Sequence, residues 1–247
     1  MKGLLIGASA SGAGKTTLSL GLARAFTRLG VAVQPYKSGP DYIDPAFLAA
    51  ATGRACFNLD SWAMGAGEIG ALVGRAAGAE LALAEGSMGL FDGVALKGAS
   101  GHGASAEIAA LTGWPVLLVL DVRGQAQTAA AIAAGLARFR PDMQVAGVVL
   151  NRVASPRHER LLRAGMAQAG LRVFGALPRQ EDVRVPERHL GLVQAQELPK
   201  LEALLEKAAD LVAQYCDLDG LLDAAAGQDL PASAPLPRPP GQRIALA

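Results

Sequence analysis

The residues best suited to chemistry begin near the N-terminus, in the segment GASASGAGKTTL at residues 7–18. An apolar run, LLIGA, leads into this segment, and a pattern typical of a helix follows from Lys15. Phosphate-binding loops have this setting, because backbone N–H groups and the helix N-terminus then point at an anion. Lys15 would bridge the outer phosphates, and the Thr16 hydroxyl would bind Mg²⁺. The residues expected to contact the nucleotide here are Gly12, Ala13, Gly14, Lys15, Thr16 and Thr17.

Ser9 departs from the strict form of this motif, which has a glycine five residues before Gly14. We interpret the segment as a subtype in which residues 7–8 open the turn, while Gly12 and Gly14 allow the backbone to approach the phosphates. The alternative is an ordinary strand-to-helix turn that binds no ligand. The run Gly-Lys-Thr-Thr in its expected place argues against that alternative.

A carboxylate that helps to hold the metal is expected at the end of another strand, and LALAEGSMGLFDG supplies one. The apolar run 81–84 ends at Glu85, and Gly86 follows, where the backbone can approach a ligand. Asp92, in the glycine-bracketed loop that comes next, is a second candidate. The alternative for Glu85 is a solvated charge at the end of a strand.

The segment YKSGPDYIDPAF brings a lysine and two carboxylates to the same edge. Lys37 ends a strand, and the turn forced by the Gly-Pro pair presents Asp41 and Asp44. These groups could position a substrate or a second cation beside the phosphates. The alternative is a polar turn in which Asp44 caps a helix begun by the next proline, and the two roles of Asp44 are compatible.

Asn151 and Arg152 follow the apolar strand at 144–150. The asparagine amide could pair with a base edge at the rim of the nucleotide pocket. Without a phosphate-binding loop nearby, an ordinary strand-end turn would be the better interpretation. The charged group in VPERHLGL, at residues 185–192, is typical of a solvated loop.

All these residues require a sheet whose strands end at one edge. Short β-branched runs alternate with longer Ala- and Leu-rich segments, which predicts an α/β fold of the P-loop NTPase type. Its mostly parallel sheet would carry helices on both faces and bind ligands at the carboxyl ends of the strands. Strands are expected near residues 2–7, 31–36, 80–85, 115–121, 144–150 and 171–176. Helices are expected over 14–30 and near 104–112, 126–139, 156–169 and 199–216.

Composition excludes several classes of function. The 23 basic and 22 acidic residues leave a net charge of +1, so no whole-molecule field recruits nucleic acid or an anionic membrane. The 51% of hydrophobic residues indicates a well-buried globular protein. No signal peptide or bilayer-spanning run is present, which favours a cytoplasmic protein. Cys56, Cys216 and three scattered histidines lack the spacing of a metal or disulfide framework.

The chain becomes proline-rich from about residue 224, in AAAGQDLPASAPLPRPPG, and there it cannot continue a helix or a central strand. We predict a synthetase domain at 1–223, a linker at 224–241 and the first residues of a further domain, QRIALA, at 242–247. A frayed tail is the alternative for this end of the chain.

Four segments in order resemble one family: KSGPDYIDPAF, FNLDSW, EGSMGLFDG and PERHLGL. Together with GKTT they resemble the ATP-binding domain of the cobyrinic acid or hydrogenobyrinic acid a,c-diamide synthases of corrin biosynthesis, over residues 3–224. The resemblance implies a domain similar to dethiobiotin synthetase, followed in the family by a class I glutamine amidotransferase domain. Neither cysteine of this chain has the setting of the glutaminase nucleophile, so we expect no glutamine-dependent activity. Activity with free ammonia as the nitrogen donor is compatible with the synthetase domain.

The resemblance also implies a reaction. ATP phosphorylates a carboxylate of the corrin macrocycle, and ammonia, normally derived from glutamine, converts the acyl phosphate to an amide at the a and c acetate side chains. The implied catalytic residues are Lys15, Lys37, Asp44, Glu85 and Asp92, and the implied Mg²⁺ ligands are Thr16, Asp44 and Glu85. The implied substrate side consists of Lys37, Asp41, Tyr42, Asn58, Asp60, Ser87, Met88 and Asp92, and the nucleotide side adds Asn151, at the adenine, and Arg152. The expected partners are the corrin and ammonia, with neither nucleic acid nor membrane, and a homodimer is compatible with the sequence.

Two other functions remain open on the sequence. A dethiobiotin synthetase-like ligase would activate a carbamate, but GPDYIDP and GLFDG speak against it. A switch ATPase that partitions DNA or positions proteins would carry a signature lysine five residues before the P-loop lysine, where this chain has Ala10.

Overall fold

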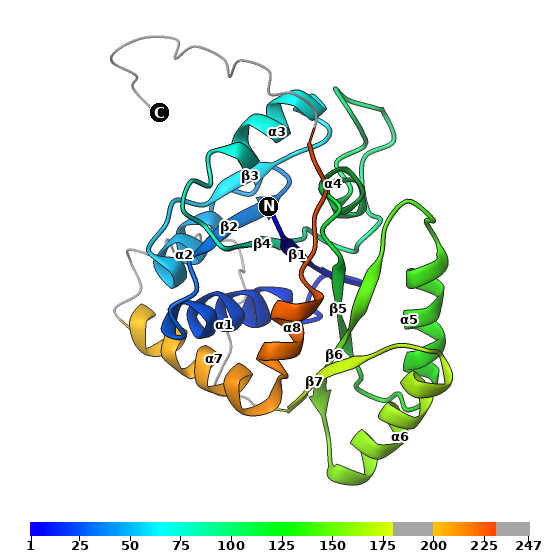
Figure 1. Ribbon diagram of the computed structural model, residues 1–247. Coiled ribbons are helices and arrows are strands. Elements are labelled where there is room, and N and C mark those ends of the chain that lie inside the picture. Colours follow the sequence, from blue (N-terminus) through cyan, green and yellow to red (C-terminus); the bar gives the residue numbers. More distant parts are fainter. Residues whose placement is uncertain (180–199, 231–247) are drawn as a thin grey trace.

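The computed structural model describes residues 1–179 and 200–230. Their centre is a seven-stranded sheet with the strand order β3-β2-β4-β1-β5-β6-β7, and every strand pairing in it is parallel (Figure 1). The strands are β1 (Gly3–Ala8), β2 (Val33–Ser38), β3 (Phe57–Leu59), β4 (Leu81–Glu85), β5 (Val116–Asp121), β6 (Val145–Val153) and β7 (Val173–Pro178). The helices are α1 (Lys15–Arg28), α2 (Asp44–Thr52), α3 (Ala66–Gly74), α4 (Ser105–Thr112), α5 (Thr128–Arg138), α6 (Pro156–Gln168), α7 (Leu201–Tyr215) and α8 (Leu218–Ala224).

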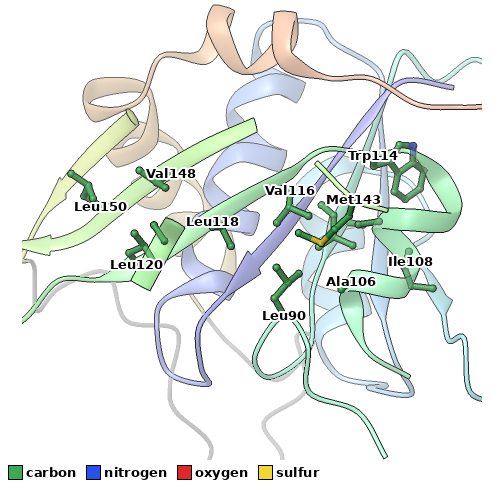
Figure 2. Close-up of a cluster of buried hydrophobic side chains, with 14 of the residues drawn as sticks. Leu90, Ala106, Ile108, Trp114, Val116, Leu118, Leu120, Met143, Val148 and Leu150 are labelled. Atoms are coloured by element: carbon green, nitrogen blue, oxygen red, sulfur yellow. The ribbon is translucent and has the colours of Figure 1, made fainter. Parts of the chain in front are cut away.

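Helices cover both faces of the sheet, as the sequence predicts. On one face, α1, α2, α7 and α8 pack their apolar residues, including Leu18 and Val212, against the strands. On the other face, α3, α4, α5 and α6 contribute to a second cluster (Figure 2). There Leu118 and Val148 of the strands share the layer with Ile108 of α4. Burial of both faces explains why the strands are short continuous apolar runs rather than alternating ones.

The six strands expected from the sequence are confirmed, with small shifts of their ends. Four elements were not among those expected: β3, α3, α8, and α2, which was considered only as the alternative helix begun by a proline. β3 has only three residues, too few for a periodic pattern to be recognised. α3, with the sequence AGEIGALVG, contains three glycines, which disfavour a helix. It forms because the sheet buries Ile69 and Val73. α8 lies in a region that the sequence analysis assigned only to the end of the ordered domain.

Parallel pairing brings the ends of all the strands to one edge. Three loops important for the site lie there: residues 9–14 after β1, 39–43 after β2 and 86–104 after β4. Asn151 and Arg152, near the end of β6, lie on the same edge because Asn151 is in register with the last residue of β5. The fold therefore assembles groups that are far apart in the sequence.

The first residues of the proline-rich segment lie against the body of the domain. Gly3 donates its backbone N–H to the carbonyl oxygen of Ala226 at 2.8 Å, in an antiparallel bridge. The Gln228 side chain donates to the carbonyl oxygens of Ala110 and Leu111, at 3.0 and 2.8 Å. Residues 231–247, which include the expected start of a further domain, lie outside the described residues. No helix in the described part is long and apolar enough to cross a membrane.

Two glycines in helix interiors give a matched test of this packing. A Cβ atom on Gly21 of α1 would lie 2.6 Å from the carbonyl oxygen of Ala208 in α7, whereas a Cβ on Gly135 of α5 would meet nothing within 4 Å. We expect Gly21→Ala to lower the free energy of unfolding by about 1–3 kcal/mol, because the helices must move apart. Gly135→Ala should instead leave it unchanged or raise it by up to about 1 kcal/mol. Urea unfolding of both variants measures the difference, and equal stabilities would contradict the close α1–α7 contact.

Candidate nucleotide and substrate site

The loop between β1 and α1 has the backbone that a phosphate-binding loop needs. Gly12 and Gly14 have φ angles of 72° and 101°, in the left-handed region that favours glycine. A Cβ atom on Gly14 would lie only 2.2 Å from Nδ2 of Asn151, so a larger residue does not fit. Gly14 is also the N-cap of α1, whose free N–H groups therefore face the loop.

Lys15 reaches from the phosphate-binding loop to the loop after β4. Its Nζ donates to the carbonyl oxygen of Met88 and, at 3.3 Å, to that of Ala10. Burial lowers the pKa of Lys15, although the carboxylate of Glu85 acts in the opposite direction. The ammonium thus connects the phosphate-binding loop to the loop after β4.

The carboxylate of Glu85 is the centre of the site. It ends β4 with an exposed fraction of 1%, and its Oε1 accepts hydrogen bonds from Thr16 Oγ1 at 2.7 Å and from Lys37 Nζ at 3.2 Å. Its other oxygen, Oε2, is buried and has no hydrogen-bond partner among the described residues. A buried carboxylate oxygen without a partner is costly, so Glu85 is suited to a cation.

Lys37 joins Glu85 to Asp44. The register of β2 and β4 places Lys37 beside Glu85, and the ammonium also lies 2.7 Å from Oδ2 of Asp44. Burial alone would favour the neutral amine, but the charges of Glu85 and Asp44 outweigh it and raise the pKa of Lys37 above its ordinary value. The lysine therefore stays charged within a buried ion-pair group.

Asp44 is the first residue of α2, and its suggested role as the helix cap is wrong. The carboxylate of Asp41 instead accepts hydrogen bonds from the backbone N–H groups of Ile43 and Asp44, at 2.8 and 3.2 Å. Asp44 points to Lys37. Burial, together with the charge of Glu85, raises the pKa of Asp44 to about 6, although Lys37 opposes the shift.

Thr16, Asp44 and Glu85, the expected Mg²⁺ ligands, belong to one connected group of side chains, and the metal site itself stays a prediction. Thr16 contacts Glu85 directly, and Asp44 is linked to it through Lys37. No group of three His, Cys, Asp or Glu side chains suited to a metal ion occurs within residues 1–179 and 200–230. Two carboxylates and a hydroxyl fit a Mg²⁺ ion, which usually keeps water and phosphate oxygens among its ligands.

Besides Lys37 and Asp41, six residues were expected on the substrate side, and they divide into two groups. Asn58, Asp60 and Ser87 use their side chains to hold loops. Asn58 donates to the carbonyl oxygens of Gly39 and Asp41, each at 2.7 Å, and Asp60 accepts from the backbone N–H of Trp62 at 2.9 Å. Ser87 donates to the carbonyl oxygen of Ser38. The second group consists of Tyr42, Met88 and Asp92, which are exposed, although Asp92 also accepts a hydrogen bond from the backbone N–H of Gly89 at 2.8 Å.

Asn151 and Arg152 donate side-chain hydrogen bonds to the backbone of the phosphate-binding loop. Asn151 donates to the carbonyl oxygen of Ala13 at 2.8 Å, and Arg152 donates to that of Gly12 at 2.9 Å. Arg152 has a φ of 65° and is held by Asp121, with 2.5 Å between Nη1 and Oδ2. The expected adenine contact of Asn151 stays a prediction, but the contacts to the loop place both residues in the nucleotide half of the site.

Sequence reasoning missed Asp121. It ends the apolar strand β5 as Glu85 ends β4, so the same strand-end signal could have found it. Burial acts to raise the pKa of Asp121, but the hydrogen bonds from Arg123 and the charge of Arg152 outweigh it and lower the pKa below its ordinary value. The VPERHLGL segment lies outside the described residues. Burial raises the pKa of both cysteine thiols, Cys56 and Cys216, which suits neither to nucleophilic catalysis.

Comparison with known proteins agrees with the resemblance to the diamide synthases. The chain is 61% identical over 246 residues to a hydrogenobyrinate a,c-diamide synthase of Rhodobacter capsulatus, and 49% identical over 252 aligned residues to one of Brucella suis. Each alignment covers 100% of this chain and 57% of the relative, so the chain spans little more than half the length of the proteins it matches. The resemblance to the diamide synthases is thereby confirmed for the part of them that this chain covers.

The predicted fold class is confirmed as well. The MinD cell division protein of Aquifex aeolicus superposes with a TM-score of 0.51 at 14% sequence identity, over 91% of this chain and 95% of that protein. At that identity the likeness concerns the fold alone. The profile of the CobQ/CobB/MinD/ParA nucleotide binding domain matches residues 4–193, which include the phosphate-binding loop, Lys37, Glu85 and Asn151. The chain therefore belongs to the CobQ/CobB/MinD/ParA nucleotide-binding domain family.

Proposed function

We propose that this chain carries the ATP-dependent amide-forming site of a hydrogenobyrinic acid a,c-diamide synthase, an enzyme of cobalamin biosynthesis. The observation that carries the proposal is the buried group of Glu85, Lys37 and Asp44 directly beside Thr16 of the phosphate-binding loop. The names of the relatives at 61% and 49% identity support hydrogenobyrinic acid as the substrate. Amidation of cobyrinic acid, which contains cobalt, can be measured beside that of hydrogenobyrinic acid to compare the two substrates.

The residues suit phosphoryl transfer to a carboxylate. Lys15 and the N–H groups of the loop would hold the outer phosphates of ATP, and Thr16, Asp44 and Glu85 would hold Mg²⁺. When bound, the metal ion would neutralise charge on the phosphoryl group during its transfer. Lys37, charged and buried, would orient the substrate carboxylate for attack. Ammonia would then attack the carbonyl carbon of the acyl phosphate, leaving an amide and inorganic phosphate.

Free ammonia tests the reaction on this chain. We expect ATP-dependent conversion of hydrogenobyrinic acid to amides, followed by mass spectrometry, and no release of glutamate from glutamine. Glutamine hydrolysis by the isolated chain would contradict the assignment of domains. Turnover of diaminopelargonic acid with bicarbonate, or ATPase activity stimulated by DNA with no response to a corrin, would support the two rival functions instead.

The carboxylates can be tested without changing the shape of the site. Glu85→Gln and Asp44→Asn remove one negative charge each from the position next to Lys37. We expect each to lower kcat for amidation by about 10²-fold or more, because the charge balance around the transferred group is lost. The Kd for ATP, measured without Mg²⁺, should stay close to that of the unaltered chain. Unaltered turnover in both variants would exclude these carboxylates from catalysis.

The ion pair of Asp121 and Arg152, which contacts the phosphate-binding loop, can be tested separately. Asp121→Asn weakens the hold on Arg152 and, through it, on the carbonyl oxygen of Gly12. We expect the Kd for ATP to rise about tenfold, which corresponds to about 1.4 kcal/mol. The matched control is Asp142→Asn, which removes an exposed ion pair with Arg140 away from the loop. Equal ATP affinity in the two variants would show that the Asp121–Arg152 pair has no part in nucleotide binding.

A further inference from the structure

Large apolar side chains are exposed on the loops after three neighbouring strands. Tyr42, after β2, is 66% exposed, and Trp62, after β3, is 49% exposed. In the loop after β4, the exposed fractions are 60% for Met88, 53% for Val94 and 80% for Leu96. We call these five residues the apolar rim. Exposed apolar residues that gather in one region are a sign of a binding surface.

The apolar rim occupies only the substrate half of the edge. The nucleotide half consists of the loops after β1, β5 and β6, at residues 9–14, 122–127 and 154–155. In those three loops, all of which the structure describes, no large hydrophobic side chain is exposed. The two halves of the edge therefore differ in chemistry: one is suited to phosphates and the other to an apolar ligand.

Hydrogen bonds fix the loop that carries Val94 and Leu96. Val94 donates its N–H to the carbonyl oxygen of His102 at 2.8 Å, and Ala99 donates to that of Trp62 at 2.7 Å. The indole Nε1 of Trp62 donates to the carbonyl oxygen of Leu96 at 3.1 Å. These bonds hold the backbone on both sides of Leu96, whose side chain is 80% exposed. A preformed loop that keeps apolar side chains in water is typical of a ligand site.

The first turn of α4 connects this loop to the reacting groups. Glu107 accepts a hydrogen bond from Ser61, next to Trp62, at 2.6 Å. Ser105, two residues earlier, donates to the hydroxyl of Ser38 at 3.2 Å, and Ser38 follows Lys37 on β2. The apolar rim and the lysine that would orient the carboxylate are therefore parts of one hydrogen-bonded framework.

A cation accompanies the apolar side chains. Lys97 follows Leu96 and is exposed, and it forms no ion pair with any residue in the described part of the chain. A ligand that matches both features has an apolar ring face and carboxylates at its periphery. A small aliphatic acid would leave most of the apolar rim in water.

We propose that Trp62, Val94 and Leu96 bind the ring face of the corrin, with Lys97 pairing with a peripheral carboxylate. This inference rests on the proposed function and deepens it, because it assigns specificity for a macrocycle to side chains outside the phosphoryl-transfer group. Two other members of the apolar rim lie close to the reacting groups: Tyr42 is two residues before Asp44, and the carbonyl oxygen of Met88 accepts a hydrogen bond from Lys15. The apolar rim thus selects the substrate, while Lys37 and its carboxylate partners act on it.

The test compares two changes that each remove exposed apolar surface. The variant Trp62→Ser/Leu96→Ser removes it from the apolar rim, and Leu29→Ser removes a 60% exposed leucine from the end of α1. Equilibrium dialysis of the 247-residue chain gives the Kd for hydrogenobyrinic acid and, separately, for ATP. We expect the corrin Kd to rise about tenfold or more in the double variant, with the ATP Kd unchanged, and neither Kd to change in Leu29→Ser.

A second variant distinguishes the contact of the Trp62 ring with the corrin from the hydrogen bond by which Trp62 holds the loop. Trp62→Phe keeps an aromatic face but loses the Nε1 hydrogen bond to Leu96, and we expect it to keep the corrin Kd near that of the unaltered chain. An unchanged corrin Kd in the double variant, or an equal rise in its ATP Kd, would overturn the inference while leaving the proposed function standing. Failure of the unaltered chain to bind a corrin would overturn the proposed function itself.

Discussion

The site depends on one buried carboxylate oxygen that is shared by two parts of the fold. Oε1 of Glu85 accepts from Thr16, at the start of α1, and from Lys37, on the neighbouring strand. A buried charge in this position requires compensation, and the two donors supply it. The carboxylate thereby links the first turn of α1, directly after the phosphate-binding loop, to the carboxyl end of β2.

The strand order explains how the two halves of the edge come to differ. β4 lies between β2 and β1, so Glu85 is positioned between the loops that follow them. On the β1, β5 and β6 side, Asn151 and Arg152 support the phosphate-binding loop by contacting its carbonyl oxygens. On the β2, β3 and β4 side, the exposed side chains of the apolar rim gather. Within the described residues, the strand order thus divides the edge into two halves that meet at Glu85.

Much of this arrangement could be predicted from the sequence. Strands buried on both faces leave continuous apolar runs, and a charged residue directly after such a run, as at Glu85, is readily noticed. The phosphate-binding loop is equally clear because its glycines and lysine are contiguous. The order of the strands is not encoded in any local pattern, so the contacts of Glu85 with Thr16 and Lys37 could not be derived.

Other features depend on tertiary packing. β3 and α3 are short or glycine-rich and form because neighbouring elements bury them. Asp44, the first residue of α2, pairs with Lys37 of the preceding strand, while Asp41 accepts hydrogen bonds from the backbone N–H groups at the start of the helix. Asn58 and Asp60 were expected to face a substrate, and the structure adds their hydrogen bonds to neighbouring loops. The exposure of the Trp62 and Leu96 side chains likewise depends on the folded loops and could not be predicted from the sequence.

The most direct test of the central claim follows one oxygen atom. If the site activates a carboxylate by phosphorylation, the oxygen that bridges carbon and phosphorus comes from the substrate and leaves with the phosphate. Hydrogenobyrinic acid labelled with ¹⁸O in its carboxylates, turned over with ATP and ammonia, should transfer one ¹⁸O to inorganic phosphate for each amide formed. Phosphate that carries no label while amide accumulates would contradict carboxylate activation at Glu85 and Lys37.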